Sequence, residues 1–460
     1  MLQNKTTMKR IFLLLLFGAI MQTTSAQLKI SANGRYLVKS DGAAFFWMGD
    51  TAWELFHRLN REQSTYYLKR RSEQGFTVVQ AVALAEFDGL HVPNAYGDLP
   101  LKFDDPTQPN EAYFKHVDFI IDKAAEYNIS VAFLPTWGDK VSKSSWGKGP
   151  EIFTPGNARI YGQWLGKRYK DKKNIIWIIG GDRNPENEEQ KNIWRALAEG
   201  IAAGVGGNDS ALISFHPQPN DLGAGQYFYE DAWLDFNMFQ NGHCRDTRVF
   251  DKIQASYNRK PVKPVIDGEP IYEDHPVCFR PADLGYSNAY DVRKYAYLDV
   301  FAGAFGHTYG CHDIWQFYSP YREAVNGPRT YWQEAMELPG AGQMKYLRRL
   351  IESRPMLDRV PDQSLVVEND LAASERIQAT RGTDYAFIYT AAGRSFTVNG
   401  GKISGGKINV SWFNPRNGEV KKVDAVNNNG QMVFIPPSSG HGMDWVLVID
   451  DAAKKYADIK

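Results

Sequence analysis

Two carboxylates follow short apolar runs, at points where a buried strand is expected to give way to a loop. Asp182 follows Ile175–Ile179 through two glycines. Glu269 follows Val265–Ile266 and precedes Pro270. A residue before proline is held in extended geometry, which limits the backbone freedom of Glu269. Two carboxylates held at the ends of buried strands predict acid/base or nucleophilic chemistry on a bond that lies between them.

Polar and aromatic residues occupy the ends of the other predicted strands. Amides and carboxylates hydrogen-bond hydroxyl groups, and tryptophan offers a flat apolar face with a polar edge, so we expect a polyhydroxylated ligand. Glycoside hydrolysis needs two carboxylates that flank one bond, a protonated acid and an ionised partner. We expect Asp182 to be the acid/base and Glu269 the nucleophile. The expected substrate-binding residues are Asp50, Trp53, Gln80, Trp137, Arg183, His216, Gln240 and Trp315.

Each of these residues also has a structural interpretation. Asp182 could cap the following loop, and Glu269 could pair with an arginine at the rim. The tryptophans and His216 could equally be core or rim residues. A metal-dependent hydrolase would need clustered histidines and carboxylates, whereas the nine histidines are scattered, so we expect no metal and no cofactor. The rival carboxylates are Glu86, Asp88, Glu273 and Asp274.

These residues need a scaffold that brings distant strand ends together. Nearly continuous apolar strands alternate with helices, which is typical of a parallel sheet buried on both faces. Eight such units within residues 45–353 predict a (β/α)8 TIM barrel, whose site lies at the carboxyl ends of its strands. The alternative is an open doubly wound sheet, but Gly49–Trp53 is not its glycine-rich phosphate turn. The predicted strands are Phe45–Met48, Thr77–Leu84, Ile129–Leu134, Ile175–Ile179, Ala211–Phe215, Met238–Gln240, Val265–Ile266 and about His307–Trp315.

Local signals predict several boundaries. Asn33–Gly34 is a strong turn signal, so residues 28–38 are expected to form a hairpin. Ser64 can cap a helix that runs to Gln74. Asn110 can cap another, whose apolar residues recur at nearly helical spacing.

A second domain is predicted after the barrel, since 460 residues exceed what one core usually holds. From about Leu357 the helices are replaced by short alternating segments, the first at Leu365–Glu368 and the last at Trp445–Ile449. Turns rich in glycine, asparagine and proline separate them, which indicates a β-sandwich. We therefore expect a catalytic barrel over residues 27–356 and a small all-β sandwich over residues 357–460.

The N-terminus has the features of a secretory signal peptide. Lys9–Arg10 precedes the apolar run Ile11–Ile20, and Thr24–Ala26 supplies small residues for cleavage after Ala26. A membrane anchor is the alternative, but the run is short for a bilayer. Residues 1–26 are therefore expected to be removed, leaving a periplasmic or extracellular protein with no further membrane contact.

Charge and cysteine content limit the partners. The formal net charge is zero, so nothing indicates a nucleic-acid or membrane-surface partner, and we expect a monomer that acts on a polysaccharide or oligosaccharide. Export permits disulfides. Cys244 and Cys278 follow predicted strands on the same side of the barrel and are the preferred pair among the three cysteines.

Motifs at three strands resemble those of the apiosidase-like glycoside hydrolases, family 140. They are Phe46–Trp53, Gly180–Asn184 and Asp267–Pro270. The C-terminal segments Ser411–Gly418 and Asp444–Leu447 are similar to the β-sandwich often attached to that barrel, a module labelled collagen-binding. We interpret this module instead as accessory or stabilising.

The resemblance implies cleavage of apiose-linked side chains of the pectin rhamnogalacturonan-II by exported enzymes of gut bacteria. It also implies an acid/base aspartate after strand four and a glutamate nucleophile after strand seven, which correspond to Asp182 and Glu269. One departure is visible, because the wider group of retaining barrels has Asn-Glu where this chain has Gly181–Asp182. We expect a retaining mechanism. The alternatives are another plant-polysaccharide specificity, a non-catalytic carbohydrate-binding barrel, and a matrix-protein binder acting through the sandwich.

Overall fold

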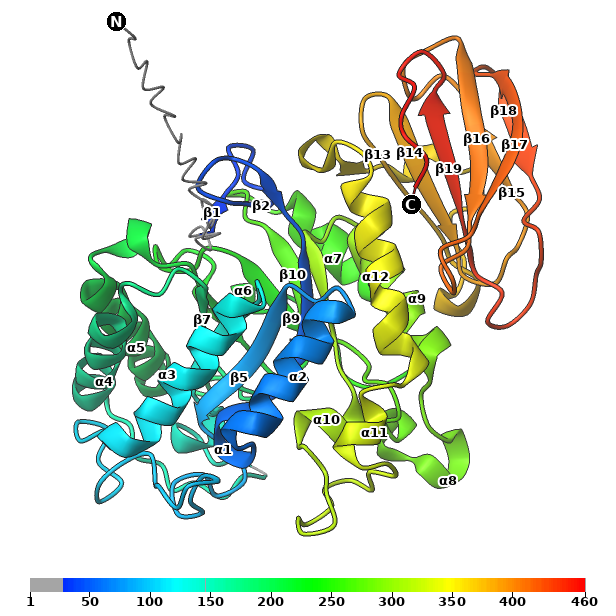
Figure 1. The fold of residues 1–460 in the computed structure, drawn as a ribbon. Helices are drawn as coiled ribbons and strands as arrows, with labels where there is room; N and C mark the ends of the chain where they lie inside the picture. Colours follow the sequence, from blue (N-terminus) through cyan, green and yellow to red (C-terminus); the bar gives the residue numbers. More distant parts are fainter. Residues whose placement is uncertain (1–27, 145, 460) are drawn as a thin grey trace, which may run out of the picture.

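The computed structural model describes residues 28–144 and 146–459, so the predicted signal peptide lies outside the described residues. A barrel of parallel strands and surrounding helices makes up the larger part (Figure 1). Six of its strands are hydrogen-bonded in the order β11-β4-β5-β6-β7-β8, and β9 pairs with β10. The strands are β4 (Trp47–Thr51), β5 (Val78–Leu84), β6 (Ser130–Thr136), β7 (Ile175–Gly180), β8 (Ile213–His216), β9 (Asn237–Gln240), β10 (Val265–Glu269) and β11 (Gly306–Tyr309).

Backbone hydrogen bonds close the ring on both sides of the β9–β10 pair. The N–H of Asp235, just before β9, donates to the carbonyl of Ile213 on β8, and the N–H of Phe305, just before β11, donates to that of Val265 on β10. Every residue of β5 and β6 is buried, as expected where helices cover a parallel sheet. The predicted TIM barrel is confirmed.

Helices that follow the strands cover the outside of the barrel. They are α2 (Arg61–Glu73), α3 (Glu111–Glu126), α4 (Pro155–Tyr169), α5 (Glu188–Val205), α6 (Gly225–Phe228), α7 (Val249–Asn258), α9 (Ala289–Phe301) and α12 (Pro339–Glu352). Asn110 caps α3 as predicted. The cap predicted at Ser64 is wrong, because Asn60 and Gln63 form a capping box and start α2 earlier. None of the described helices is long and apolar enough to span a membrane.

Two strand ends differ from the prediction. β4 continues through Asp50 to Thr51, so Asp50 lies inside a strand rather than beyond its tip. β11 stops at Tyr309, and the segment predicted to continue it, His312–Trp315, forms the short helix α10. The predicted hairpin is present as β1 (Lys29–Ile30) and β2 (Leu37–Val38), and β3 (Ala44–Phe45) adds a third strand.

The C-terminal part is all-β, as predicted. β12 (Val360–Pro361), β13 (Ile377–Arg381), β14 (Tyr385–Thr390), β19 (Trp445–Asp451), β16 (Lys407–Phe413) and β17 (Val420–Asn427) form one antiparallel sheet. β15 (Phe396–Asn399) and β18 (Gln431–Phe434) form a second. The strand predicted at Leu365–Glu368 is instead a 3₁₀ turn at Gln363–Leu365 followed by a single bridge from Val366.

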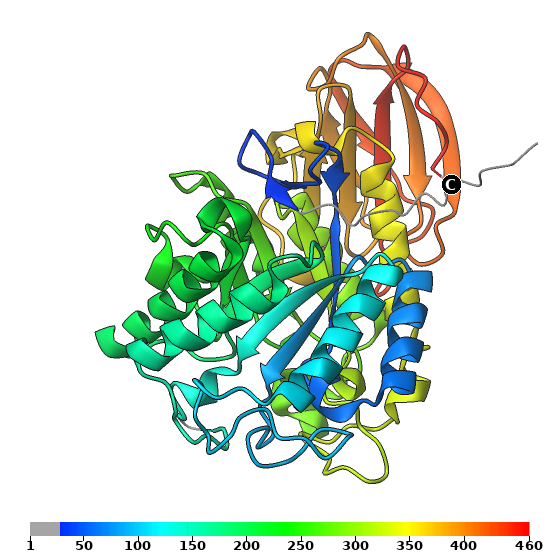
Figure 2. The same ribbon diagram turned by 60° about the vertical axis from the view of Figure 1, so that its left-hand side comes forward.

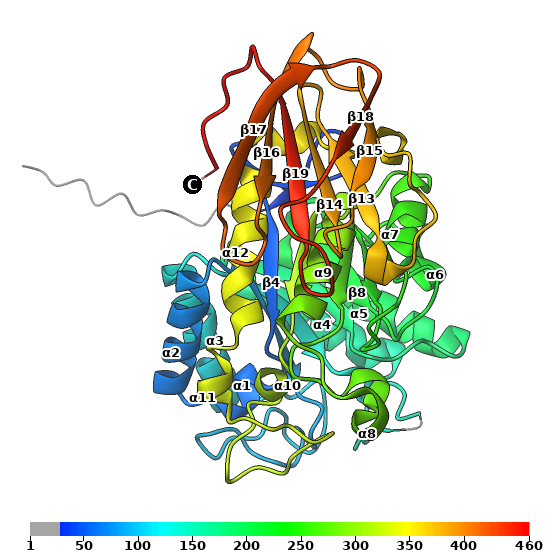
Figure 3. The same ribbon diagram turned by 90° about the vertical axis from the view of Figure 1, so that its right-hand side faces the viewer.

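The all-β part packs against α9 of the barrel. Arg293 on α9 donates two hydrogen bonds to the Asp444 carboxylate, at 2.8 and 2.7 Å. The rings of Tyr297 and Tyr389 stack across the same interface. Figures 1 and 3 show this part above α9 and α12, at the end of the barrel away from α10 and the helices α1 (Leu55–Arg58), α8 (Pro281–Leu284) and α11 (Trp332–Ala335). Figure 2 shows the same separation from another side.

Candidate active site

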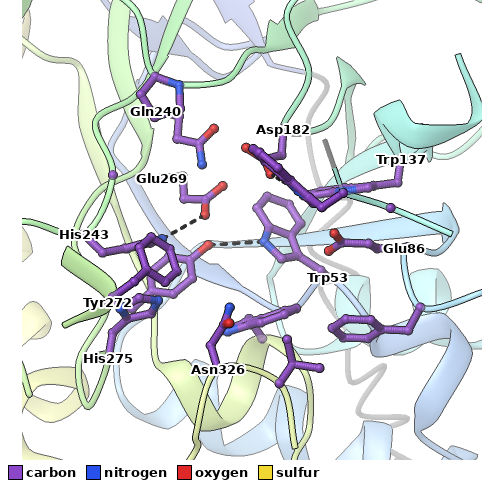
Figure 4. A pocket seen from close by; sticks show the side chains of 18 of the residues that line it. Trp53, Glu86, Trp137, Asp182, Gln240, His243, Glu269, Tyr272, His275 and Asn326 are labelled. Carbon is purple, nitrogen blue, oxygen red and sulfur yellow. Dashed lines mark hydrogen bonds and ion pairs between the residues drawn. The ribbon is translucent and has the colours of Figure 1, made fainter. Parts of the chain in front are cut away.

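A cavity of about 680 Å³ lies among the loops that follow the barrel strands, and its lining includes both Asp182 and Glu269 (Figure 4). This volume is typical of a small-molecule or sugar site. The other residues that line it include Trp53, Glu86, Phe87, Trp137, Trp146, Gln240, His243, Tyr272, His275, Trp315 and Asn326.

Glu269 ends β10 and is held by two histidines. The register between β9 and β10 shifts around Gly268, where a Cβ would lie 2.6 Å from the Met238 sulfur. The carboxylate oxygens lie 3.0 Å from Nε2 of His216 and 3.5 Å from Nε2 of His243. Burial would raise the pKa of Glu269, but these two histidines outweigh it and hold the pKa at about 2. The carboxylate is therefore ionised at neutral pH.

His216 links the Glu269 carboxylate to the backbone of Asp182. Its Nδ1 accepts the backbone N–H of Asp182 at 3.3 Å. A neutral imidazole has one donor and one acceptor nitrogen, so its proton sits on Nε2, the atom that faces Glu269. His216 thus contacts both the Glu269 carboxylate and the backbone that carries Asp182.

Tyr272 adds a hydroxyl on the same wall of the cavity. The Trp53 indole donates to its oxygen at 3.2 Å, which leaves the phenol proton free for the hydrogen bond that Tyr272 makes with Glu269. Figure 4 shows the hydrogen bond between Trp53 and Tyr272 and, beside it, the ion pair between His243 and Glu269. Burial, Glu269 and this bond raise the pKa of Tyr272 well above its usual range, so the phenol remains a donor.

Asp182 is mounted on an unusual stretch of backbone. Gly180, Gly181 and Asp182 all have positive φ, at 92°, 120° and 50°. A Cβ at Gly181 would lie 2.8 Å from the Trp137 ring. This run of left-handed residues turns the chain sharply after β7 and directs Asp182 into the cavity, at an energetic cost that is typical of functional sites.

The environment of Asp182 is opposite to that of Glu269. Burial and the negative charge of Glu269 raise the pKa of Asp182 to about 6, against Arg183, His216 and a hydrogen bond from Gln240. One carboxyl group is thus ionised while its neighbour retains a proton into the mildly acidic range. This division suits an acid/base paired with a nucleophile.

A third carboxyl group lies in the same cavity. Burial, followed by the charges of Asp182 and Asp139, raises the pKa of Glu86 to about 8. Glu86 is therefore neutral near pH 7 and can donate a hydrogen bond to a ligand. Figure 4 shows it on the side of Trp53 and Trp137, away from Glu269.

The structure separates the predicted substrate-binding residues into three groups. Asp50 and Gln80 are fully buried and are not among the described lining residues, since Asp50 accepts from Arg71 at 2.6 Å and Gln80 donates to the Gly268 carbonyl at 2.8 Å. Arg183 and His216 support Asp182 and Glu269 from behind. The group that lines the cavity comprises Trp53, Trp137, Gln240 and Trp315.

Several cavity residues were not in the predicted set. Tyr272 follows the strand that carries Glu269, so reading a few residues further along this loop could have found it. His275 stacks on His243, with ring centroids 4.0 Å apart. Trp146 lies in a long loop after β6, where no strand-end signal marks it.

A disulfide joins two loops at this end of the barrel. Cys244 follows β9 and Cys278 follows β10, and the two are bonded as expected. Cys311 has a free, buried thiol. The bond ties the loop that carries His243 to the loop that carries His275.

Two family models match successive parts of the chain. Residues 31–358 match a model described as "Apiosidase-like, catalytic domain". Residues 360–450 match one described as "Putative collagen-binding domain of a collagenase". No protein in a curated set of sequences matches the chain.

Solved structures resemble the whole chain. A glycoside hydrolase family 5 protein from Bacteroides vulgatus is 36% identical with a TM-score of 0.86, over 94% of this chain and 95% of that one. A second structure, titled only glycoside hydrolase, has the same identity and TM-score and covers 94% and 98%. An exo-β-1,4-mannosidase from Opitutaceae bacterium strain TAV5 shares the fold at 12% identity and a TM-score of 0.53, over 71% and 63%.

The first model covers more than two thirds of the chain, and the two most similar of these structures are glycoside hydrolases over nearly its full length. A carbohydrate is the substrate class that follows. By this likeness, and with two carboxyl groups of opposite character facing one cavity, the chain belongs to the apiosidase-like family of glycoside hydrolases.

Proposed function

We propose that this protein cleaves an apiose-linked side chain of rhamnogalacturonan-II by a retaining mechanism, with Glu269 as nucleophile and Asp182 as acid/base. The observation that carries the proposal is the division of charge between these carboxyl groups in one cavity of an apiosidase-like barrel. In the first step Glu269 bonds to the anomeric carbon while Asp182 gives its proton to the departing oxygen. In the second, Asp182 takes a proton from the water that releases the sugar.

The predicted substrate-binding residues receive roles from their positions. Trp53, Trp137 and Trp315 provide apolar faces for the sugar, and Gln240 bonds the substrate beside Asp182. His216 and Arg183 act through the two carboxyl groups they contact. Asp50 and Gln80 stabilise the barrel interior, because Asp50 accepts a hydrogen bond from Arg71 and Gln80 donates one to the Gly268 carbonyl.

Incubation with purified rhamnogalacturonan-II tests the proposal. Release of an apiose-containing product, seen by mass spectrometry and absent with E269Q, is the expected result. If the mechanism is retaining, proton NMR should show that the released sugar first appears with the same anomeric configuration as in the substrate. Activity on another plant glycan alone would overturn the apiose assignment, and an inverted first product would overturn the retaining mechanism.

Export and the role of the all-β part belong to the same proposal. Secretion into the periplasm or medium predicts a mature N-terminus at Gln27, measurable by mass spectrometry of the exported protein. A stabilising role for the all-β part is supported by its packing on α9 through Arg293 and Tyr297. Binding of fibrillar collagen by the purified protein would contradict that role.

A further inference from the structure

The loop between β6 and α4 reaches Asp182 through Trp146. The indole N–H of Trp146 donates to Oδ2 of Asp182 at 3.2 Å. The ring also lines the cavity and is 47% exposed. One side chain therefore contacts both the expected acid/base carboxyl group and the space that a substrate would occupy.

Arg183 fixes Trp146 in this position. Its guanidinium lies over the indole, 4.6 Å from the ring centroid, and its Nη2 donates to the Trp146 carbonyl at 2.6 Å. The same guanidinium donates to the Ser142 carbonyl at 3.2 Å, so it holds the loop at two points. These contacts hold the exposed indole in one orientation, whereas a freely rotating surface ring has no such partners.

Besides the hydrogen bond from Gln240, two N–H donors reach Asp182, and both approach the same oxygen. Trp146 Nε1 lies 3.2 Å and Arg183 Nη1 lies 3.4 Å from Oδ2. An oxygen that accepts two N–H groups is the poorer position for an acidic proton, so the proton of the neutral acid belongs on Oδ1.

We propose that Trp146 is a positioning residue, which reserves Oδ2 of Asp182 as an acceptor and leaves Oδ1 to exchange the proton with the substrate. The proposal rests on the assignment of Asp182 as the acid/base. When the Oδ1–H bond breaks and the proton passes to the glycosidic oxygen, the new negative charge is shared with Oδ2. The Trp146 hydrogen bond then becomes charge-assisted, which stabilises the step that produces the carboxylate.

Other groups also act on this carboxyl group, and the test must separate them. Arg183 adjoins it, His216 faces it from β8, Gln240 from β9 and Glu269 from β10, and Glu86 lies beyond β5. None of these groups lies on the β6–α4 loop, which carries Trp146. Its removal therefore changes the acid without altering the nucleophile's own contacts with His216 and His243.

Indole NMR tests the contact without any substrate. The protein labelled with ¹⁵N-tryptophan gives one N–H signal per indole, and the signal lost in W146F, or in W146Y if W146F does not fold, identifies Trp146. We expect this signal to shift with pH around the pKa of Asp182, about 6, and to stop shifting in D182N. A Trp146 signal that ignores both pH and D182N would overturn the proposal.

Kinetics test the consequence of the contact. In W146F the kcat/KM for an aryl apioside is expected to fall roughly 10-fold, because a charge-assisted bond is lost. The alkaline limb of its pH profile should move up by about half a unit, because loss of a donor raises the pKa of the acid. Trp164→Phe on α4, outside the cavity, is the matched control. An unmoved limb in W146F would overturn the positioning role, whereas failure of the wild type on every apioside would overturn only the substrate assignment and leave the NMR result decisive.

Discussion

The two walls of the cavity differ in how they hold a carboxyl group. Glu269 sits in a buried setting on β10 and is held by ring nitrogens of His216 and His243. Asp182 sits on a strained turn, 16% exposed at its side chain, with a loop tryptophan and Arg183 beside it. The first wall stabilises the negative charge of Glu269, and the second allows Asp182 to lose and regain a proton. Two carboxyl groups of similar intrinsic acidity are thus separated by their neighbours alone.

The largest expected effect comes from breaking the charged wall. In E269Q the nucleophile is lost while its shape is kept, so we expect kcat to fall roughly 10⁴-fold. The measurement is product release from an aryl apioside. E269Q should also lower the pKa of Asp182, because the negative charge that raises it is gone. Residual activity within tenfold of the wild type would assign the nucleophile elsewhere.

The proton-exchanging wall is broken by D182N. We expect kcat/KM to fall about 10²–10⁴-fold for a natural linkage, which needs its leaving oxygen protonated. An aryl apioside with an acidic leaving group needs less help, so its first step should lose much less. Added azide should then restore turnover and give a glycosyl azide of retained configuration. Equal losses on both substrates, with no azide rescue, would contradict the acid/base role.

Substitution of His216 is expected to reduce the difference in pKa between the two carboxyl groups. In His216→Ala we expect kcat/KM to fall about 10–100-fold, because a hydrogen bond to a charged group is lost. The pKa of Glu269 should rise from about 2 toward its usual value, so the acid limb of the pH profile moves to higher pH. His91→Ala, at an exposed histidine, is the control. The idea fails if the acid limb stays in place.

The smallest effect is expected at Glu86, where glutamine resembles the neutral acid. E86Q should keep kcat/KM within about threefold of the wild type near pH 7, whereas E86A loses the ligand-facing donor and more activity. The raised pKa of Glu86 stabilises the fold fully below pH 4.5, and this contribution is lost as pH rises through about 8. The Tm of E86Q relative to the wild type should therefore increase over this range. A constant difference would show that Glu86 is ionised throughout.

Much of the barrel could be predicted because its strands carry strong local signals. β5 to β7 are mostly apolar, Glu269 is the last residue of β10, and Asp182 follows β7 after one glycine. The eighth strand was harder, since Tyr309 is followed by Gly310–Phe317, a segment that mixes apolar and polar residues without a clear period. Its turn into α10 depends on contacts such as the Trp315 indole with His312, which no local pattern reveals.

The site was less predictable where a role depends on a distant partner. Asp50 resembles a strand-tip carboxylate, but it forms a buried ion pair with Arg71 on α2 inside the barrel. His216 resembles a sugar contact, but one of its nitrogens accepts the backbone N–H of Asp182 and the other lies beside the Glu269 carboxylate. In each case the residue type indicated a polar task, and only the tertiary structure showed whether ligand or protein supplies the partner.

The packing of the all-β part on α9 has a thermodynamic consequence. Phe387, Tyr389, Val446 and Val448 belong to the same buried cluster as the barrel core. A barrel that lost them would expose Tyr297 and Phe301 and leave Arg293 without its carboxylate. The two parts should therefore unfold as one cooperative unit, with a single calorimetric transition whose van't Hoff enthalpy matches the measured heat.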